Sequence, residues 1–383
     1  MKKLLFFSYF ISYYIFLFIY AYFMDIGSLE AEYLSKSYPI TLLENNFLQI
    51  FGHNNISLRL PSLLLSIASI FLYYQISKKY LKKINDVYLS TFIFSLMPGF
   101  IIASLLFNKS IYMIFLVLLF IYTFNYYRFY SYILLLLYTI LNYSFISFYV
   151  ALIFYSIYKK DTKFLIYSIF LLAINANYFN YDIKGYPKGH FVDIVLVYFA
   201  IFSPFVFIYF LYSLVKTFKK PTLLWFISSW GLLFSFLLSF RQKIKIDDYA
   251  PFVIVAIVFM VATFLHGYRV RLKIFRPMYR LLFGFLLTSL VLFDIILLAS
   301  PYFLNKKIVT QFRYSYKISQ KLKQNNINYI YCNDEKFCKK LYFYGLQKGD
   351  KFYLKFDEKQ KKVSISHNNK KILDFYVSKL NKK

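Results

Sequence analysis

The chain has 383 residues, of which 60% are hydrophobic and only 16% are charged. Soluble domains average about 25% charged residues, so this composition excludes an ordinary soluble protein and favours a lipid environment. The net charge of +29 does not by itself indicate nucleic-acid binding, because many of the cations lie in short loops between apolar runs, where they set topology. The apolar runs lack the alternation of a transmembrane β-barrel, so we expect a bundle of helices.

The first apolar run covers residues 4–23 and follows Lys2 and Lys3. A secretory signal peptide has a shorter apolar core of about 7–15 residues and a cleavage site of small residues after it. This run is longer, and no such cleavage site follows it. We therefore expect an uncleaved first span with a cytoplasmic N-terminus.

The loops between the apolar runs predict the topology, because Lys and Arg accumulate on the cytoplasmic side. The basic clusters placed inside are Lys2-Lys3, 78–83, Arg128, Lys159-Lys160, 216–220 and 269–280. The expected spans are 4–23, 59–77, 86–106, 110–127, 129–142, 145–158, 164–178, 194–215, 222–240, 249–266 and 281–300. The stretch 129–158 is short for two spans, but two are needed to keep Arg128 and Lys159 on the same side.

This topology divides the chain into two parts. Residues 1–302 form an α-helical polytopic membrane domain of about eleven helices, with a first outer loop at about 24–58. Residues 303–383 form a small extracytoplasmic domain, which is basic because the tail after Leu304 has 20 Lys or Arg against 6 Asp or Glu. A helix near 310–325, a strand ending at Cys332, a helix at 335–341, two later strands at 351–356 and 361–366 and a final segment at 371–377 predict an α/β or α+β fold. We expect a bacterial inner-membrane protein whose C-terminal domain is periplasmic.

The two cysteines, Cys332 and Cys338, both fall in this C-terminal domain. Outside a bacterial cytoplasm such a pair commonly forms a disulfide, which is the favoured interpretation. A zinc site is less favoured, because two cysteines without clustered histidines supply too few ligands. Two unpaired thiols in a small core remain the other alternative.

Ionisable side chains in the outer loops are the candidates for chemistry. They are Asp25, Glu30, Glu32, Glu44 and Arg59 in the first loop, His190 with its neighbours in the loop at 178–193, and Arg241, Lys243, Lys245, Asp247 and Asp248 in the loop RQKIKIDD. Cations on the outer side run against the usual loop bias, so the last loop suggests a receptor for a phosphate group. Alternatively, its two aspartates simply neutralise its lysines.

The order of these features resembles the C-type glycosyltransferases that use polyprenyl-phosphate sugars, in the branch of protein O-mannosyltransferases and lipid A aminoarabinose transferases. The resemblance lies in LEAEYLSKSYPITLLENNFLQIFGHNNISLRLPS after the first span, and in the later segments YPKGHFVDIVLVYFAIFSPF and FSFLLSFRQKIKIDDYAPFVIVAI. In the first segment Glu30 and Tyr33 match an acidic motif, but Leu29 occupies the position of its catalytic aspartate.

The resemblance implies a GT-C-like fold and sugar transfer from a polyprenyl-phosphate donor to a lipid, glycan or protein acceptor on the periplasmic face. With Leu29 in place of the aspartate, the base is assigned to Asp25 or Glu30. The donor phosphate is assigned to Arg59, Arg241, Lys243 and Lys245, and a divalent metal ion to Glu44 and His190. The alternatives are a catalytically inactive scaffold or glycolipid-binding subunit and a lipid-linked sugar transporter; no nucleic-acid partner is expected.

Overall fold

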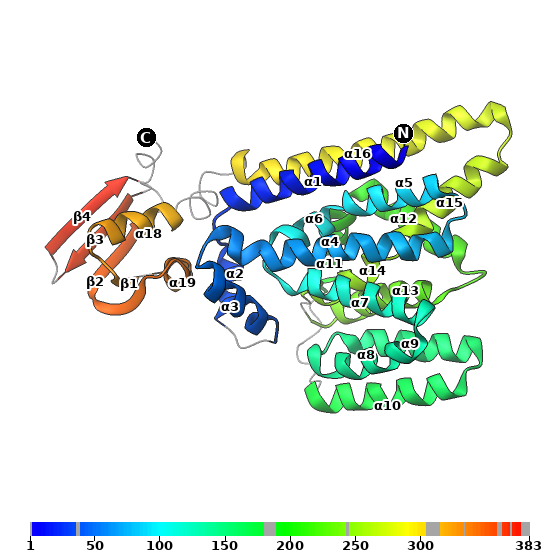
Figure 1. Ribbon diagram of the computed structural model, residues 1–383, viewed down its shortest axis with the longest axis horizontal. Coiled ribbons are helices and arrows are strands. Elements are labelled where there is room, and N and C mark those ends of the chain that lie inside the picture. Colours follow the sequence, from blue (N-terminus) through cyan, green and yellow to red (C-terminus); the bar gives the residue numbers. More distant parts are fainter. Residues whose placement is uncertain are drawn as a thin grey trace.

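The structure is a computed structural model of the chain. It describes residues 2–35, 39–179, 189–242, 245–303, 315–332, 334–357, 362–367 and 370–376. A long helical bundle ends in a small domain that contains a β-sheet, and this C-terminal domain lies at the end of the bundle opposite the N-terminus (Figure 1).

Among the described residues, six helical stretches are long and apolar enough to cross a membrane. They are α1 (Lys2–Phe23), α4 (Asn55–Tyr80), α7 (Lys109–Tyr126), α10 (Thr162–Phe179), α14 (Ala250–Ile254) continued by α15 (Ile257–Val270), and α16 (Arg276–Phe303). Shorter apolar helices are α8 (Arg128–Leu141), α9 (Phe145–Lys159) and α13 (Leu223–Ser239). The chain is therefore a polytopic membrane protein, and eleven crossings remain a prediction.

Two of the expected spans are bent rather than straight. The helix pair α5 (Ile84–Ser95) and α6 (Pro98–Leu105) bends by 60°, and the pair α11 (Phe191–Phe202) and α12 (Pro204–Thr217) bends by 99°. A proline opens the second helix of each pair, and proline cannot continue the hydrogen bonding of a preceding helix. The segments predicted as spans at 86–106 and 194–215 are therefore each a pair of helices with a break, and that each pair makes one crossing stays a prediction.

The loops between the helices form two groups, and the following contacts each join loops of the same group. The basic loops meet one another in three pairs, Lys79 with Asn125, Arg128 with Asp161, and Arg269 with Asp86. Asp248, by contrast, contacts both Lys109 and Tyr143. The turn between α8 and α9 thus lies with the loops that the sequence places outside, as the predicted hairpin requires.

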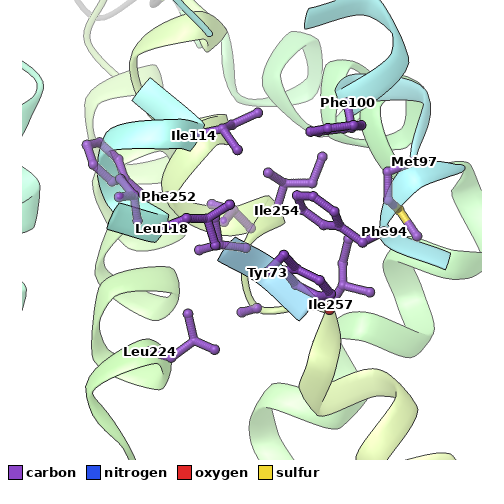
Figure 2. Close-up of a cluster of buried hydrophobic side chains, with 14 of the residues drawn as sticks. Tyr73, Phe94, Met97, Phe100, Ile114, Leu118, Leu224, Phe252, Ile254 and Ile257 are labelled. Carbon is purple, nitrogen blue, oxygen red and sulfur yellow. The ribbon is translucent and has the colours of Figure 1, made fainter. Parts of the chain in front are cut away.

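The core of the bundle is aromatic and aliphatic. Tyr73 from α4 stacks on Phe94 from α5 with 4.0 Å between ring centroids, and Phe94 in turn meets Phe100 at the start of α6 (Figure 2). Ile254 and Ile257 pack beside them from the break between α14 and α15 (Figure 2). Helices α1 and α16 lie side by side along one flank, where the Tyr20 hydroxyl donates to the Leu298 carbonyl at 3.0 Å (Figure 1).

The first outer loop contains two short helices, α2 (Ser28–Leu34) and α3 (Pro39–Phe51), and two 3₁₀ turns lie at Ile246–Asp248 and Lys273–Phe275. The C-terminal domain contains α18 (Ser315–Gln324), β1 (Tyr329–Cys332), α19 (Glu335–Phe343), β2 (Gln347–Asp357), β3 (Lys362–His367) and β4 (Lys370–Tyr376). Its strands lie in chain order; β1 and β2 are parallel, because α19 crosses between them, and the others are antiparallel. Cys332 and Cys338 form a disulfide that joins β1 to α19.

Candidate functional site

Arg59 organises the first outer loop. Its guanidinium is fully buried and uses all five N–H donors within the protein. The acceptors are the carbonyls of Leu105, Met24, Asn55 and Asp25 at 2.9, 2.6, 3.3 and 2.9 Å, and Glu30 Oε2 at 3.0 Å. No donor remains for a phosphate in this arrangement, so the assignment of Arg59 to the donor phosphate is corrected.

Glu30 is held as firmly as its partner. Its Oε1 accepts from the Phe107 amide at 2.8 Å, and its Oε2 accepts from the Gly27 amide at 2.7 Å and from Arg59. The bond to Gly27 caps the start of α2, and the bond to Phe107 ties that helix to the segment after α6. The geometry therefore describes an anchoring carboxylate with little room for an acceptor hydroxyl.

Asp25 lies just after α1 and is held more weakly than Glu30. Its Oδ1 accepts from Asn55 Nδ2 at 3.4 Å and its Oδ2 from the Tyr316 amide at 3.3 Å, both long for hydrogen bonds. Burial raises the pKa of the Asp25 carboxyl, and these bonds together with the nearby Arg59 charge offset part of that effect. Of the two predicted bases, Asp25 is the carboxyl that can more easily exchange a hydrogen-bond donor of the protein for an acceptor hydroxyl.

A cavity of about 620 Å³ borders Asp25. Its wall combines aromatic side chains such as Tyr22, Phe23 and Phe51 with polar groups from the start of α4 and with Lys317 of α18. Leu29, which occupies the position of the motif's aspartate, is 70% exposed. The carboxylate at this cavity therefore comes from the end of α1 and not from the position that the motif assigns.

The C-terminal domain covers this loop. The Tyr344 hydroxyl donates to Asn55 Oδ1 at 2.5 Å and accepts from the Ile26 amide at 3.1 Å. Phe343 and Tyr344 join a small apolar cluster with residues of the loop, and α19 packs against α2. The sequence offered no signal for this contact, because its two halves lie some 290 residues apart in the chain.

Lys340 of α19 is a second cation near the acidic loop that the sequence reasoning missed. It is almost completely buried, and burial lowers the pKa of its ammonium group to about 8, against the opposing charges of Asp334, Asp25 and Glu30. The C-terminal domain thus brings a titratable cation to the loop that carries the predicted bases.

Glu44 and His190, the two residues assigned to a metal ion, lie on different elements. Glu44 is buried in α3, where its Oε2 accepts from the Tyr112 hydroxyl at 3.3 Å and its Oε1 has no partner among the described residues. Burial raises the pKa of the Glu44 carboxyl to about 8. His190 precedes α11, and its ring lies 3.2 Å from Asp193 Oδ2. The described residues contain no cluster of three or more His, Cys, Asp or Glu that could hold a metal ion, and a metal ion on Glu44 and His190 stays a prediction from the sequence.

The loop RQKIKIDD is tied to the start of α7 by its acidic end. Asp248 pairs with Lys109 and also accepts from Tyr143, while Asp247 accepts from the Ser110 hydroxyl at 3.0 Å. The sequence suggested that the two aspartates neutralise the lysines of their own loop. Asp248 instead forms an ion pair with Lys109, which belongs to α7. Arg241 and Lys245 are exposed, and Lys243 lies outside the described residues.

No protein-family model matches the chain, and no curated protein matches its sequence. Its structure matches the crystal structure of ArnT from Cupriavidus metallidurans in the apo state, with 10% sequence identity and a TM-score of 0.57. The chain has the GT-C fold of ArnT. The match covers 91% of this chain and 84% of ArnT, so it extends beyond the helical part that ends at Phe303 and into the C-terminal domain. The GT-C fold predicted from the motifs is confirmed.

Proposed function

We propose that the chain is an integral-membrane glycosyltransferase that moves a sugar from a polyprenyl-phosphate donor to a lipid, glycan or protein hydroxyl. The reaction would take place at the end of the bundle that carries the C-terminal domain, on the periplasmic face. The ArnT fold supports this class of activity. The single observation that carries the assignment of the site is the buried Asp25 carboxyl at the wall of the 620 Å³ cavity.

In the proposed reaction Asp25 removes the proton from the acceptor hydroxyl. The acceptor oxygen then forms a bond to the anomeric carbon, and the bond between that carbon and the phosphate oxygen breaks with its electron pair leaving on the polyprenyl phosphate. Burial suits this role, because a carboxylate with a raised pKa is a stronger base once it is ionised. Aromatic side chains such as Tyr22 and Phe23 provide apolar surface for a sugar ring or for prenyl units.

Cations at the same end of the bundle would stabilise the charge that develops on the phosphate. Lys317 lines the cavity itself, and Arg241, Lys243 and Lys245 are retained from the sequence as further candidates. Arg59 acts indirectly, by holding the backbone of Met24 and Asp25 in place. A metal ion on Glu44 and His190 stays a sequence-based prediction, and no step is assigned to it.

The test compares Asp25→Asn with a matched control, Glu335→Gln. Glu335 is a carboxylate of α19 with an 84% exposed side chain, so its substitution removes a similar charge at the same end of the molecule without touching the cavity. The full chain is reconstituted in proteoliposomes with undecaprenyl-phosphate-linked mannose, glucose or aminoarabinose and a membrane extract as the source of acceptor. The readout is the release of undecaprenyl phosphate.

We expect Asp25→Asn to lower the release rate by a factor of roughly 10²–10⁴, the usual contribution of a general base, while Glu335→Gln keeps the parental rate. Release by Asp25→Asn at the parental rate would remove Asp25 from the mechanism. The exposed Leu29 at the motif's aspartate position favours a second candidate, a non-catalytic glycolipid-binding subunit. If the chain is such a subunit, the unsubstituted protein should bind one of the three lipid-linked sugars saturably and release no undecaprenyl phosphate.

The transporter alternative has one structural feature in its favour, the two bent helix pairs, since broken helices also form the substrate sites of transporters. It predicts movement of a labelled donor across the vesicle membrane without formation of a glycosylated product. The same proteoliposomes test it.

A further inference from the structure

A second cavity lies in the helical bundle, away from the C-terminal domain. It has a volume of about 430 Å³ and is lined only by Phe, Tyr, Leu and Ile side chains of α12, α15 and α16. Two of its tyrosines satisfy each other, because the hydroxyls of Tyr209 and Tyr279 lie 3.2 Å apart. The lining is therefore suited to a hydrocarbon chain and not to a sugar or an ion.

The groove is short enough to lie within one leaflet of a membrane. From Tyr279 to Leu286 along α16 the groove extends over seven residues, about 10 Å of helix, and half of a hydrocarbon core is about 15 Å thick. Phe205 and Phe285 lie with 5.1 Å between ring centroids at its deeper end. Its other end is near the turn between α15 and α16, in the group of loops that carries the basic clusters.

Cations stand at this second end of the groove. The Arg271 guanidinium lies 4.0 Å from the centroid of the Tyr279 ring, and Lys216 Nζ lies 5.7 Å from that of Tyr212; both tyrosines line the groove. Within the part of the chain that the structure describes, neither cation has an acidic partner. The neighbouring Arg269, by contrast, donates to both oxygens of Asp86 at 2.7 and 2.6 Å.

Loop topology alone requires only that cations lie on this side of the membrane. It does not require them to stand over the two tyrosines that end an apolar groove. We infer that the groove binds an anionic diacyl phospholipid of this leaflet, with an acyl chain between α12 and α16 and its phosphate on Arg271 and Lys216. This site is separate from the one proposed for the donor and does not depend on the transferase assignment.

Binding of such a lipid would hold α16 against the bundle. Only Phe283, Leu290 and Asp294 are buried among the described side chains of this helix, and it is the last described helix before the C-terminal domain. A lipid packed against Leu282 and Leu286 on one side and Tyr209 on the other would add contacts that the protein alone does not provide.

The test uses the purified, delipidated full chain and native mass spectrometry with phosphatidylglycerol and phosphatidylcholine of identical acyl chains. Two cations at the headgroup predict that phosphatidylglycerol binds roughly 20-fold more tightly. The double variant Arg271→Gln/Lys216→Gln should bring the two lipids within twofold of each other. The matched control is Lys159→Gln/Lys160→Gln, which removes the same charge from the same side; Lys159 also stands over a tyrosine, Tyr158, at 5.4 Å.

A second variant keeps every charge and fills the groove. Leu282→Trp should abolish the tight binding of phosphatidylglycerol, whereas the same substitution at Leu292, an exposed residue of α16 outside the groove, should not. Glycerophosphoglycerol, the headgroup without acyl chains, should not compete. Equal binding of the two lipids by the parent, or an unchanged preference in both Leu282→Trp and the double variant, would overturn the inference.

Discussion

Arg59→Met should disrupt the first outer loop rather than a phosphate site. The substitution removes five hydrogen bonds from a fully buried position and leaves the Glu30 carboxylate with only two backbone donors. Removing one partner of a buried ion pair costs about 3–5 kcal/mol. Because each 1.4 kcal/mol is about a tenfold change, the amides of Gly27 and Phe107 should lose hydrogen-exchange protection by a factor of roughly 10²–10⁴.

Hydrogen exchange followed by mass spectrometry measures this loss in the detergent-solubilised full chain. The double variant Arg59→Met/Glu30→Gln is the control, since it removes both charges and should recover much of the lost protection. Unchanged protection in Arg59→Met, together with a higher KM for the lipid-linked donor, would refute the anchoring role and restore the phosphate assignment made from the sequence.

Three further predictions concern the outer loop and the C-terminal domain. Because the disulfide closes a loop with a sequence separation of only 6, Cys332→Ala/Cys338→Ala should lower the unfolding free energy of the C-terminal domain by about 2 kcal/mol, measured from the exchange of β1 amides, and an unchanged value would contradict this. The folded-state pKa of Glu44, about 8, lies above the ordinary value of 4.5 for a glutamate, so the folded state binds the extra proton and stability should fall as pH rises between these values. Glu44→Gln should weaken this dependence of stability on pH, measured by thermal unfolding at several pH values. If the variant keeps the pH dependence of the unsubstituted protein, another group causes it. The pKa of Lys340 is lowered from 10.5 to about 8, so the unfolded state binds more protons in this window and stability should rise with pH across it; Lys340→Met should remove this rise, and its persistence would exclude Lys340 as the cause.

The apolar runs and the basic loops were sufficient to predict most of the bundle. The hairpin at 129–158, predicted from the need to keep Arg128 and Lys159 on one side, forms two helices whose connecting turn contacts Asp248 through Tyr143; that both helices cross the membrane stays a prediction. Hydropathy could not predict the bends, since it averages over a window and the apolar residues run straight through Pro98 and Pro204. Each proline could have suggested a bend, because its ring excludes the hydrogen bond that a continuous helix needs.

The site was less predictable, because its residues are brought together by contacts between distant parts of the chain. The charge of Arg59 indicated a functional group, but only the structure shows that four carbonyl oxygens and Glu30 use all of its donors. Lys109 is the partner of Asp248, which lies 139 residues later in the chain, and no local pattern in the sequence indicates this pair. The boundary predicted between residues 302 and 303 stays a prediction, because α16 ends at Phe303 and the residues that follow lie outside those described.

The position of Asp25 gives the C-terminal domain a part in the proposed chemistry. Tyr316 and Tyr344 reach the acidic loop from that domain, and the Tyr316 amide donates to the Asp25 carboxyl that would accept the proton of the acceptor hydroxyl. Glu30 offers no such freedom, because its bonds of 2.7, 2.8 and 3.0 Å are shorter and one of them comes from a buried arginine. If the chain transfers sugars, the long bond from the Tyr316 amide to Asp25 marks the place where the C-terminal domain meets the acceptor.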